Sequence, residues 1–300
     1  YFIEPSFPKG CAPISPSNQD QVFSCQGNLR MVETPRLALT FENEKLRTIK
    51  DKKTGFMMEA SEYFINDLRI MNDRGDSYLL GKKPKKIFTT QDNELEIIED
   101  GPVRTVIRLK SKLTCKNKWF FKKTNKITQY IILNNFDTPR IDFITTFKNK
   151  IRNARIEACF PINLKNPKFH SEIPYGFMER DVKPRMGDSW ADFKKKFAYY
   201  DRIFPVINWM DVSDPNKGQG VSILNHGLPA HEIGPFKENV FLTLMRSTGY
   251  VGNIFPGAVP MVLGPFLGIP KAFELEDQEF QYSLFFHDGD FLKNRVPMEA

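Results

Sequence analysis

The chain has 300 residues, 41% of them hydrophobic, and a formal net charge of +7. This length is enough for one large β domain or two ordinary domains with a sizeable core. The 27 Phe favour half-buried strands, and the 21 Pro and 18 Gly are spread along the chain, which excludes an architecture of long helices. No apolar run approaches the length of a membrane span, so we expect no membrane partner.

Lysines and cysteines bear on the partners and the compartment. The lysines cluster at 82–86, 122–123 and 194–196, a pattern typical of solvated loops and strand edges. No RNA-binding aromatic signature or helix-turn-helix pattern accompanies them, so we expect no nucleic-acid partner. The four cysteines fit no C-x-x-C metal site and no N-x-S/T acceptor occurs, which together favour a reducing, cytoplasmic location. The chain begins with Tyr1 instead of Met, which suggests a fragment or a processed product.

Strands and turns dominate the chain after its first segment. Residues 1–30, with prolines at positions 5, 8, 13 and 16, are predicted to be a linker or an extended arm. Residues 31–300 have the rhythm of strands and turns expected of one β domain. Strands are predicted at 37–41, 45–50, 94–98, 103–109, 127–133, 141–147, 155–160, 204–210, 220–224, 240–246 and 279–286. The strands at 220–224 and 240–246 are expected to be neighbours in one sheet, joined by one long loop.

Turn signals join several of these strands. D-K-K-T-G at 51–55 offers Gly55 for a positive φ, D-G-P at 100–102 separates two strands, and residues 134–140 predict a hairpin loop. The one helical candidate is 188–200, where aromatic residues recur at helical spacing. We therefore predict an all-β protein, a large antiparallel sandwich with at most one or two short helices.

The residues that could carry chemistry are few. His226 and His231, with Glu232 beside them, are the only concentration of possible ligands. No H-x-D or H-E-x-x-H spacing occurs, so we expect no metal site in this chain. Carboxylates near predicted strand ends are interpreted as exposed turn acids: Asp211, Asp214, Glu232, Asp288 and Asp290.

Five stretches in a fixed order carry a family resemblance. ENEKLRTIKDKKTG at 42–55 is followed by GDSY at 75–78 and by GPVRTVIRLK at 101–110. The most specific stretch begins at residue 204, with FPVINWMDVSD, GVSILNHGLPAHEI and LTLMRSTG in succession. Two more stretches are IPYGFMERDVKP at 173–184 and EFQYSLFFHDGD at 279–290. With these motifs the chain, from about residue 36 to 291, resembles the C-terminal, all-β part of glycoside hydrolase family 38 α-mannosidases, in their bacterial and archaeal branch.

The resemblance implies a mutarotase-like super-sandwich for residues 31–300 and retaining hydrolysis of α-mannosides by the whole enzyme. A zinc ion would grip the sugar hydroxyls and an aspartate would be the nucleophile. Both belong to an N-terminal catalytic domain with which nothing here aligns, so the resemblance implies no catalytic residue and no cofactor in this chain. The implied partners are that catalytic domain and an α-mannoside, and a homo-oligomer is a further candidate.

The resemblance also implies that the β part completes one rim of the substrate pocket. We expect the rim at Asn225, His226, Gly227 and Glu232, together with Arg246. Asn225 and His226 can bind sugar hydroxyls, Gly227 permits the turn, and Arg246 can bind a carboxylate or phosphate of the substrate. His226 departs from the family, which often has Asp at this position. The alternative for Arg246 is a buried salt bridge with Glu232 that stabilises the sheet.

A second rim candidate is Arg180 with Glu179, which has the same structural alternative. Two other functions remain open at this point. One is a free-standing carbohydrate-binding module. The other is a mutarotase-like sugar epimerase, an enzyme with a similar sandwich that uses a histidine and a carboxylate.

Overall fold

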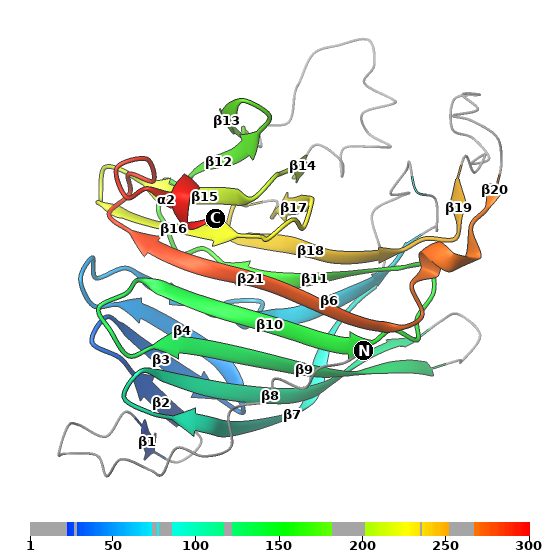
Figure 1. The fold of residues 1–300 in the computed structure, drawn as a ribbon, viewed down its shortest axis with the longest axis horizontal. Coiled ribbons are helices and arrows are strands. Elements are labelled where there is room, and N and C mark those ends of the chain that lie inside the picture. Colours follow the sequence, from blue (N-terminus) through cyan, green and yellow to red (C-terminus); the bar gives the residue numbers. More distant parts are fainter. Residues whose placement is uncertain are drawn as a thin grey trace.

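The computed structural model describes residues 23–26, 29–73, 77, 86–116, 122–181, 202–234, 236–251 and 267–300. Within these ranges the chain is almost entirely antiparallel strand (Figure 1). The described helical segments are a 3-10 turn, η2 (Pro270–Phe273), and one α-helical turn, α2 (Val296–Glu299). The predicted all-β class is therefore confirmed. The helical candidate at 188–200 lies outside the described residues, as does most of the predicted arm at 1–30.

One long sheet supplies both layers of a sandwich. Its 14 strands pair in the order β13-β12-β15-β16-β21-β10-β9-β8-β7-β6-β11-β18-β17-β14. The first layer contains β13 (Gly176–Glu179), β12 (Lys168–Ile173), β15 (Trp209–Asp214), β16 (Gln219–Leu224), β21 (Asp277–His287), β10 (Arg140–Lys148), β9 (Lys122–Asn134), β8 (Arg104–Lys116) and β7 (Ile87–Asp100). The second layer contains β6 (Asp67–Asn72), β11 (Ala154–Pro161), β18 (Asn239–Ser247), β17 (Ala230–Ile233) and β14 (Ile203–Pro205).

Strand β7 carries the sheet from one layer to the other. Thr89 at its beginning pairs with Arg69 of β6, whereas Thr90 and the residues after it pair with β8. The register shifts between Gln91 and Glu94, where Asp92 has φ +52°. A bulge of this kind bends a strand and increases its twist. The bulge therefore marks the bend at which the sheet folds over its own core.

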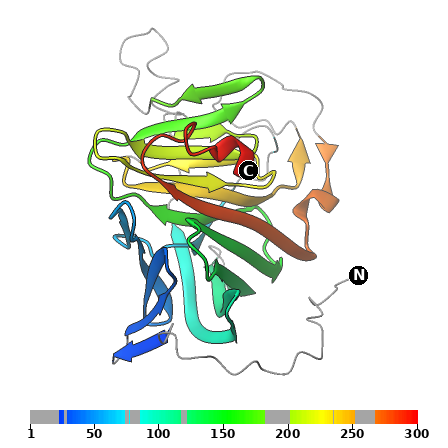
Figure 2. The ribbon, with the colours of Figure 1, turned by 60° about the vertical axis from the view of Figure 1, so that its left-hand side comes forward.

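A smaller five-stranded sheet closes the side of the sandwich. It contains β1 (Phe23–Gln26), β2 (Leu29–Glu33), β3 (Leu37–Glu42), β4 (Lys45–Asp51) and β5 (Met57–Glu59). Figure 2 shows these strands in blue beside β7 in cyan, and the Arg30 side chain of β2 donates to the Leu95 carbonyl of β7 at 3.2 Å. Strands β19 (Tyr250–Val251) and β20 (Leu267–Gly268) pair in a separate two-stranded sheet.

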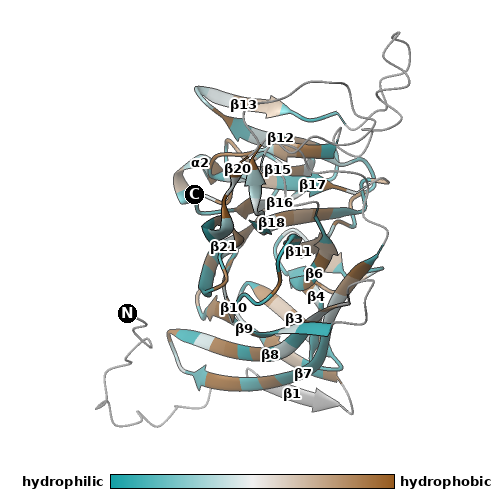
Figure 3. Cartoon of the chain, turned by 90° about the vertical axis from the view of Figure 1, so that its right-hand side faces the viewer, coloured by the Kyte–Doolittle hydropathy of each residue, from teal (hydrophilic) through white to brown (hydrophobic). Residues whose placement is uncertain are grey.

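The core lies between the layers and follows from strand alternation. Every second residue of β3 is buried, namely Leu37, Leu39 and Phe41, and the two faces of β7 and β8 alternate in hydropathy in Figure 3. One hydrophobic cluster includes residues from both layers and from the small sheet. Tyr282 of β21 crosses this core, and its hydroxyl donates to Asn66 Oδ1 at 2.7 Å. The sandwich is thus closed by apolar packing with a few internal polar links.

Several local predictions are confirmed. Gly55 has φ +70° in its turn, the strands at 94–98 and 103–109 pair as parts of β7 and β8, and residues 134–140 join β9 to β10 as a hairpin. The described helices are single turns, and none has the length and apolar character that crossing a bilayer demands.

Two expectations about the second half of the chain were wrong. The predicted strand 204–210 is two strands, β14 and β15, which lie in different layers. We had also expected the strands at 220–224 and 240–246 to be neighbours joined by one long loop. Instead β16 pairs with β15 and β21, and β18 pairs with β11 and β17. The reason is that the connection contains a strand of its own, β17, which crosses to the second layer.

Candidate functional site

Three turns meet at one corner of the sandwich, beside β13, β14 and β17. They are the β12–β13 turn, residues 206–208 before β15, and residues 225–229 after β16. The Asn208 amide donates to Glu172 Oε2 at 2.7 Å, and the Asn225 amide donates to the Asn208 carbonyl at 2.7 Å. The Val206 amide donates to the Pro229 carbonyl at 3.1 Å. These bonds make the three turns one connected surface.

Asn225 holds this corner together from inside. Its side-chain amide donates to the Ile207 carbonyl at 2.9 Å and to the Leu228 carbonyl at 2.5 Å. The residue is buried. Asn225 therefore joins two turns, and its donors are used within the chain and are not presented to a sugar.

His226 and Gly227 form the outer tip of the predicted rim. Both are exposed, with φ +45° at His226 and +86° at Gly227. Glycine accepts such a φ without a steric cost, whereas histidine adopts it only uncommonly. The imidazole of His226 is thus held at the surface by a tight turn, where it can contact a bound molecule.

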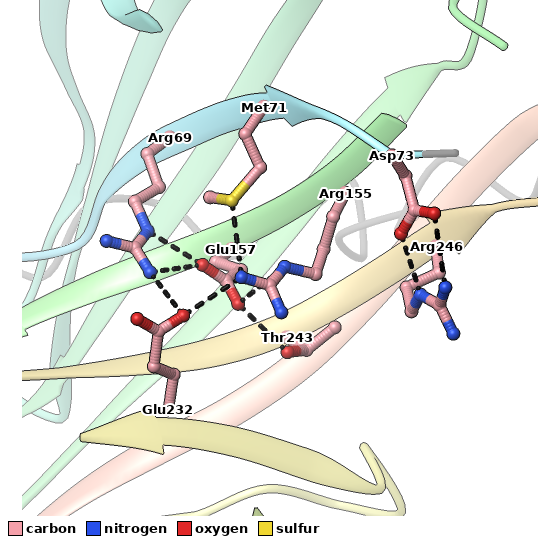
Figure 4. A network of polar contacts seen from close by, with 8 residues as sticks. All are labelled: Arg69, Met71, Asp73, Arg155, Glu157, Glu232, Thr243 and Arg246. Atoms are coloured by element: carbon pink, nitrogen blue, oxygen red, sulfur yellow. Dashed lines mark hydrogen bonds and ion pairs between the residues drawn. The ribbon is translucent and has the colours of Figure 1, made fainter. Parts of the chain in front are cut away.

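Glu232 is buried in a network of four charges (Figure 4). Its carboxylate accepts from Arg69 of β6 and from Arg155 of β11, each at 2.9 Å. The same two arginines bind Glu157, with Arg69 Nε donating at 2.7 Å and Arg155 Nε lying 3.1 Å away. Thr243 of β18 donates a further bond to Glu157 at 3.2 Å. Two positive and two negative groups balance here and tie β6, β11, β17 and β18 together.

The surroundings of this network favour a structural role. The Arg69 guanidinium lies 3.2 Å from the Phe241 ring centroid and 5.9 Å from that of Tyr63. Burial raises the pKa of the neighbouring Cys159 thiol well above its usual value, so this thiol stays protonated and is a poor nucleophile. The Glu232 carboxylate is bound by two guanidinium groups and is not placed to bind substrate.

Arg246 pairs with a different acid from the one we expected. Its guanidinium forms a two-bond contact with Asp73, through Nε at 2.9 Å and Nη2 at 3.2 Å (Figure 4). The proposed alternative, a salt bridge with Glu232, is wrong because Arg69 and Arg155 occupy that carboxylate. Arg246 lies near the far end of β18, whereas Glu232 pairs with Phe241 near its beginning.

The histidine and the acid next to each other on β17 point to opposite faces. His231 is buried between the layers, and its Nε2 lies 3.3 Å from the Ser171 hydroxyl of β12. Burial lowers the pKa of His231 to about 3, so its ring is neutral. Neighbouring strand residues alternate between faces, so His231 and Glu232 cannot bind one ion together. In the described part of the chain, no cluster of three histidine, cysteine, aspartate or glutamate side chains has the geometry to hold a metal.

The second rim candidate also has an internal partner. Arg180 donates through Nη2 to the Pro205 carbonyl at 3.2 Å, and its guanidinium lies 5.2 Å from the Phe204 ring centroid. Burial lowers its pKa. Glu179 is exposed on β13. Arg180 therefore attaches the β12–β13 hairpin to β14.

Our interpretation of the acids near strand ends was right for two and wrong for three. Asp288 and Asp290 are exposed, but Asp211, Asp214 and Glu232 are buried. Asp211 accepts from Ser213 and Ser222, each at 2.8 Å, and from His287 Nε2 at 2.7 Å. Burial alone would raise the pKa of Asp211, but polar contacts with His170, His287 and Ser222 outweigh it and lower the pKa.

The tautomer of His287 follows from its contacts. The Gly289 amide donates to Nδ1 at 3.2 Å, so the ring proton lies on Nε2 and is donated to Asp211. The ring lies directly over Gly220, where an added Cβ would be 2.3 Å from Cε1. His287 lies in the EFQYSLFFHDGD stretch of the resemblance, but its pairing with Asp211, 76 residues earlier, leaves no local signal in the sequence. The cluster is sealed from solvent and anchors the C-terminal segment to the sheet.

Comparisons with known proteins agree with this fold. The family model "Glycosyl hydrolases family 38 C-terminal domain" matches residues 32–251. A protein in glycosyl hydrolase family 38 from Enterococcus faecalis superimposes with a TM-score of 0.71 at 18% identity, over 94% of this chain and 33% of that chain. An α-mannosidase from Enterococcus faecalis V583 superimposes with a TM-score of 0.69 at 19% identity, over 90% of this chain and 30% of that chain. No curated protein matches the sequence.

The family match and the structural likeness differ in what they establish. At such low identity the two solved structures show the fold alone, and the chain spans only about a third of their length. The family model covers more than two thirds of the chain, including β3 to β19 and the corner with the three turns. The chain therefore belongs to glycosyl hydrolase family 38, as a C-terminal domain of that family.

Proposed function

We propose that this chain is the C-terminal β domain of a zinc-dependent, retaining α-mannosidase, in which it supports a catalytic region and forms one rim of the pocket. The observation that carries the proposal is the family match over residues 32–251. The structural neighbour named as an α-mannosidase supports it, because this chain superimposes on a part of that longer protein.

Among the residues that the structure describes, those suggested as zinc ligands do not fit a zinc site. His226 is in solvent, His231 faces the space between the layers, and Glu232 faces away from it and is bound by arginines. Zinc, when bound elsewhere in such an enzyme, supplies a Lewis acid for sugar hydroxyls. The contribution of this chain is to shape and position the rim, and we assign no catalytic residue to it.

The five residues expected at the rim have three different roles. His226 and Gly227 are the exposed contacts, and the imidazole can donate to or accept from a sugar hydroxyl. Asn225 and Glu232 act behind them, one by binding the turns and the other by anchoring β17. Arg246 stabilises the far end of β18 through Asp73.

We extend the proposal to a cytoplasmic location, supported by the free, buried thiols of Cys115 and Cys159.

Catalytic assays of the chain with and without the catalytic region test the proposal. Release of the aglycone from an aryl α-mannoside is measured, with and without added zinc, for the isolated chain and for the intact protein. We expect no turnover by the isolated chain and zinc-dependent turnover by the intact protein. Turnover by the rigorously purified chain alone would contradict the proposal. Saturable binding of mannosides by the chain alone would favour a carbohydrate-binding module, and sugar epimerisation would favour an epimerase.

A further inference from the structure

An aromatic side chain stands fully exposed at the end of the β12–β13 hairpin. Tyr175 has a relative exposure of 108% and φ +69°. It follows Pro174, the order of a type II turn, whose third position favours glycine. A non-glycine residue in the left-handed region costs about 1–2 kcal/mol. This turn therefore exposes a large apolar ring in a strained conformation.

Contacts along β13 attach the hairpin that carries Tyr175 to the rest of the domain. The Phe177 ring meets Phe291 edge-on at 5.2 Å and Trp209 at 6.2 Å between centroids. Arg180 binds the Pro205 carbonyl at the end of β13. Figure 3 places β13 at one extremity of the molecule, opposite β1 and β7. The exposed ring is thus presented by a fixed support.

The turns at this corner contain no Asp, Glu, Lys or Arg, and charged residues begin directly beside the first turn, at Glu172, Glu179 and Arg180. We define the tip surface as residues 173–178, 205–208 and 225–229, the three turns that hydrogen bonds connect. None of these residues is Asp, Glu, Lys or Arg, although such residues make up 26% of the chain. The large hydrophobic side chains exposed on it are Tyr175, Phe177, Met178 and Ile207. Depletion of charge together with exposed aromatic side chains is typical of the centre of a protein interface.

We propose that the tip surface is the face by which this domain docks against the catalytic region of its own enzyme, with Tyr175 as the inserted anchor. The inference rests on the proposed function. Two observations favour this occupant. The matched part is only 33% of the length of the family 38 relative, so most of such an enzyme lies beyond it. The tip surface also includes the His226–Gly227 turn, which the proposed function places at the pocket rim, so the docked face would border the pocket at this turn.

The chemistry of the surface argues for a protein partner over a sugar. A sugar site needs polar groups beside its aromatic platform to bind hydroxyls. Here the side-chain donors of Asn225 are used by backbone carbonyls, and the backbone amide of Asn208 donates to Glu172. His226 is the exposed titratable side chain of the tip surface. The apolar character instead suits a permanent contact that is covered whenever the enzyme is complete.

Amide hydrogen exchange tests the inference. It is measured for this chain alone and for the intact enzyme, on the same samples that are assayed with an aryl α-mannoside. Amides of residues 173–178 and 225–229 should exchange more slowly in the intact enzyme by roughly tenfold or more. Amides of the turns at 135–139 and 215–218, at the opposite end of the strands, should not change. Equal exchange of the tip surface in both samples would overturn docking.

Variants make the test specific for the anchor. Tyr175→Ser should restore fast exchange of the tip surface in the intact enzyme, since aromatic anchors dominate interface energies. Phe136→Ser is the matched control, because Phe136 is an exposed aromatic in a turn at the opposite end. If Tyr175→Ser fails to fold, Tyr175→Gly removes the same ring and suits the positive φ. Protection that survives both substitutions would show that Tyr175 is not the anchor.

The outcomes separate docking from the proposed function and from other occupants. Zinc-dependent activity without protection of the tip surface would overturn docking and leave the function standing. Protection without activity would contradict the function and support docking. A dimer of the chain alone that Tyr175→Ser abolishes, measured by sedimentation, would assign the surface to a second copy. Slower exchange of the chain alone in the presence of mannosides would assign it to sugar, and either result would overturn the inference.

Discussion

The two ends of the strand pair β15–β16 differ in chemistry although they belong to the same sheet. At one end the tip surface contains no Asp, Glu, Lys or Arg. At the other end, the turn with Lys217 lies beside the C-terminal segment with Asp288, Asp290 and Lys293. These four side chains are exposed, and we call this the charged end. The second end is what a turn in water usually looks like, because charged side chains are seldom buried.

Exposure alone therefore does not identify a contact face. Phe136 and Leu292 are exposed at the charged end, but single exposed apolar residues are normal on a protein surface. At the tip surface, loss of charge, a strained Tyr175 and neighbouring exposed apolar residues coincide. We therefore expect the two ends to respond differently to substitution, to pH and to the presence of the catalytic region.

The largest expected effect comes from the charge network behind the tip surface. Glu232→Ala leaves two buried guanidinium groups short of an acceptor, so the free energy of unfolding should fall by about 3–5 kcal/mol. The matched control is Lys112→Ala, which breaks an exposed pair with Asp92 and should cost about 1 kcal/mol or less. Denaturant unfolding of the chain measures both. Similar losses for the two variants would mean that the network adds no more than a surface pair.

The pH dependence should also distinguish the two ends. His231, behind the tip surface, has a folded pKa of about 3, below the usual value of about 6.5. Below pH 6.5 the unfolded chain binds a proton that the folded chain does not bind. The free energy of unfolding should therefore fall, by up to about 1.4 kcal/mol per pH unit, as the pH decreases from about 6.5 to about 3. His231→Gln should remove this slope, as measured by denaturant unfolding at a series of pH values.

Asp211, the buried acid towards the charged end, should respond at lower pH. Its folded pKa is below the usual aspartate value, so its contribution to stability is present above that value. The contribution is lost only as the pH falls through the lowered folded pKa. Asp211→Asn should therefore leave the slope between pH 4 and 6.5 unchanged. A slope in this range that depends on Asp211 and not on His231 would contradict the assignment.

A smaller loss is expected from Gly220→Ala at the charged end. The new methyl group would lie 2.3 Å from Cε1 of His287, inside a sealed cluster that has no room to relax. Overpacking of this kind costs about 1–3 kcal/mol. Thermal or denaturant unfolding would measure it. A neutral result would show that the His287 ring can move away from Gly220 and that the cluster is looser than its contacts indicate.

The smallest effect should have the opposite sign. Tyr175→Gly relieves the positive φ at the hairpin turn, so the isolated chain should gain about 1 kcal/mol of stability. Glycine also increases the entropy of the unfolded chain, which offsets part of that gain. Phe136→Ser, with no such strain to relieve, should change stability by about 0.5 kcal/mol or less. A loss of stability for Tyr175→Gly would mean that its ring packs usefully within the chain.

The sequence predicted local features better than distant ones. Strand pairs joined by a short turn, such as 127–133 with 141–147, were correct because alternation and turn residues are read from neighbouring positions. The pairing of β16 with β21, and of β6 with β11, joins segments far apart in the chain and leaves no local signal. The four-residue strand β17 was taken for loop because its Gly and Pro neighbours resemble a turn.

The candidate site shows the same limit. The resemblance pointed to His226 and Gly227, and the turn that exposes them is a local property of neighbouring residues. The partners of Glu232 could not be found from sequence, because Arg69 lies 163 residues away and Arg155 lies 77 residues away. Tyr175 was missed because its strain depends on the backbone, and Pro-Tyr-Gly is also an ordinary turn sequence.

The most direct test of the whole account is the kinetics of the intact enzyme on an aryl α-mannoside. His226→Ala changes the exposed rim and touches none of the buried network, so kcat/KM should fall while the free energy of unfolding stays within about 0.5 kcal/mol of the parent value. Phe136→Ser, at the charged end, should leave both quantities unchanged. Unaltered kcat and KM for His226→Ala, in an enzyme that is active and folded, would show that the corner with the three turns is scaffold and not rim.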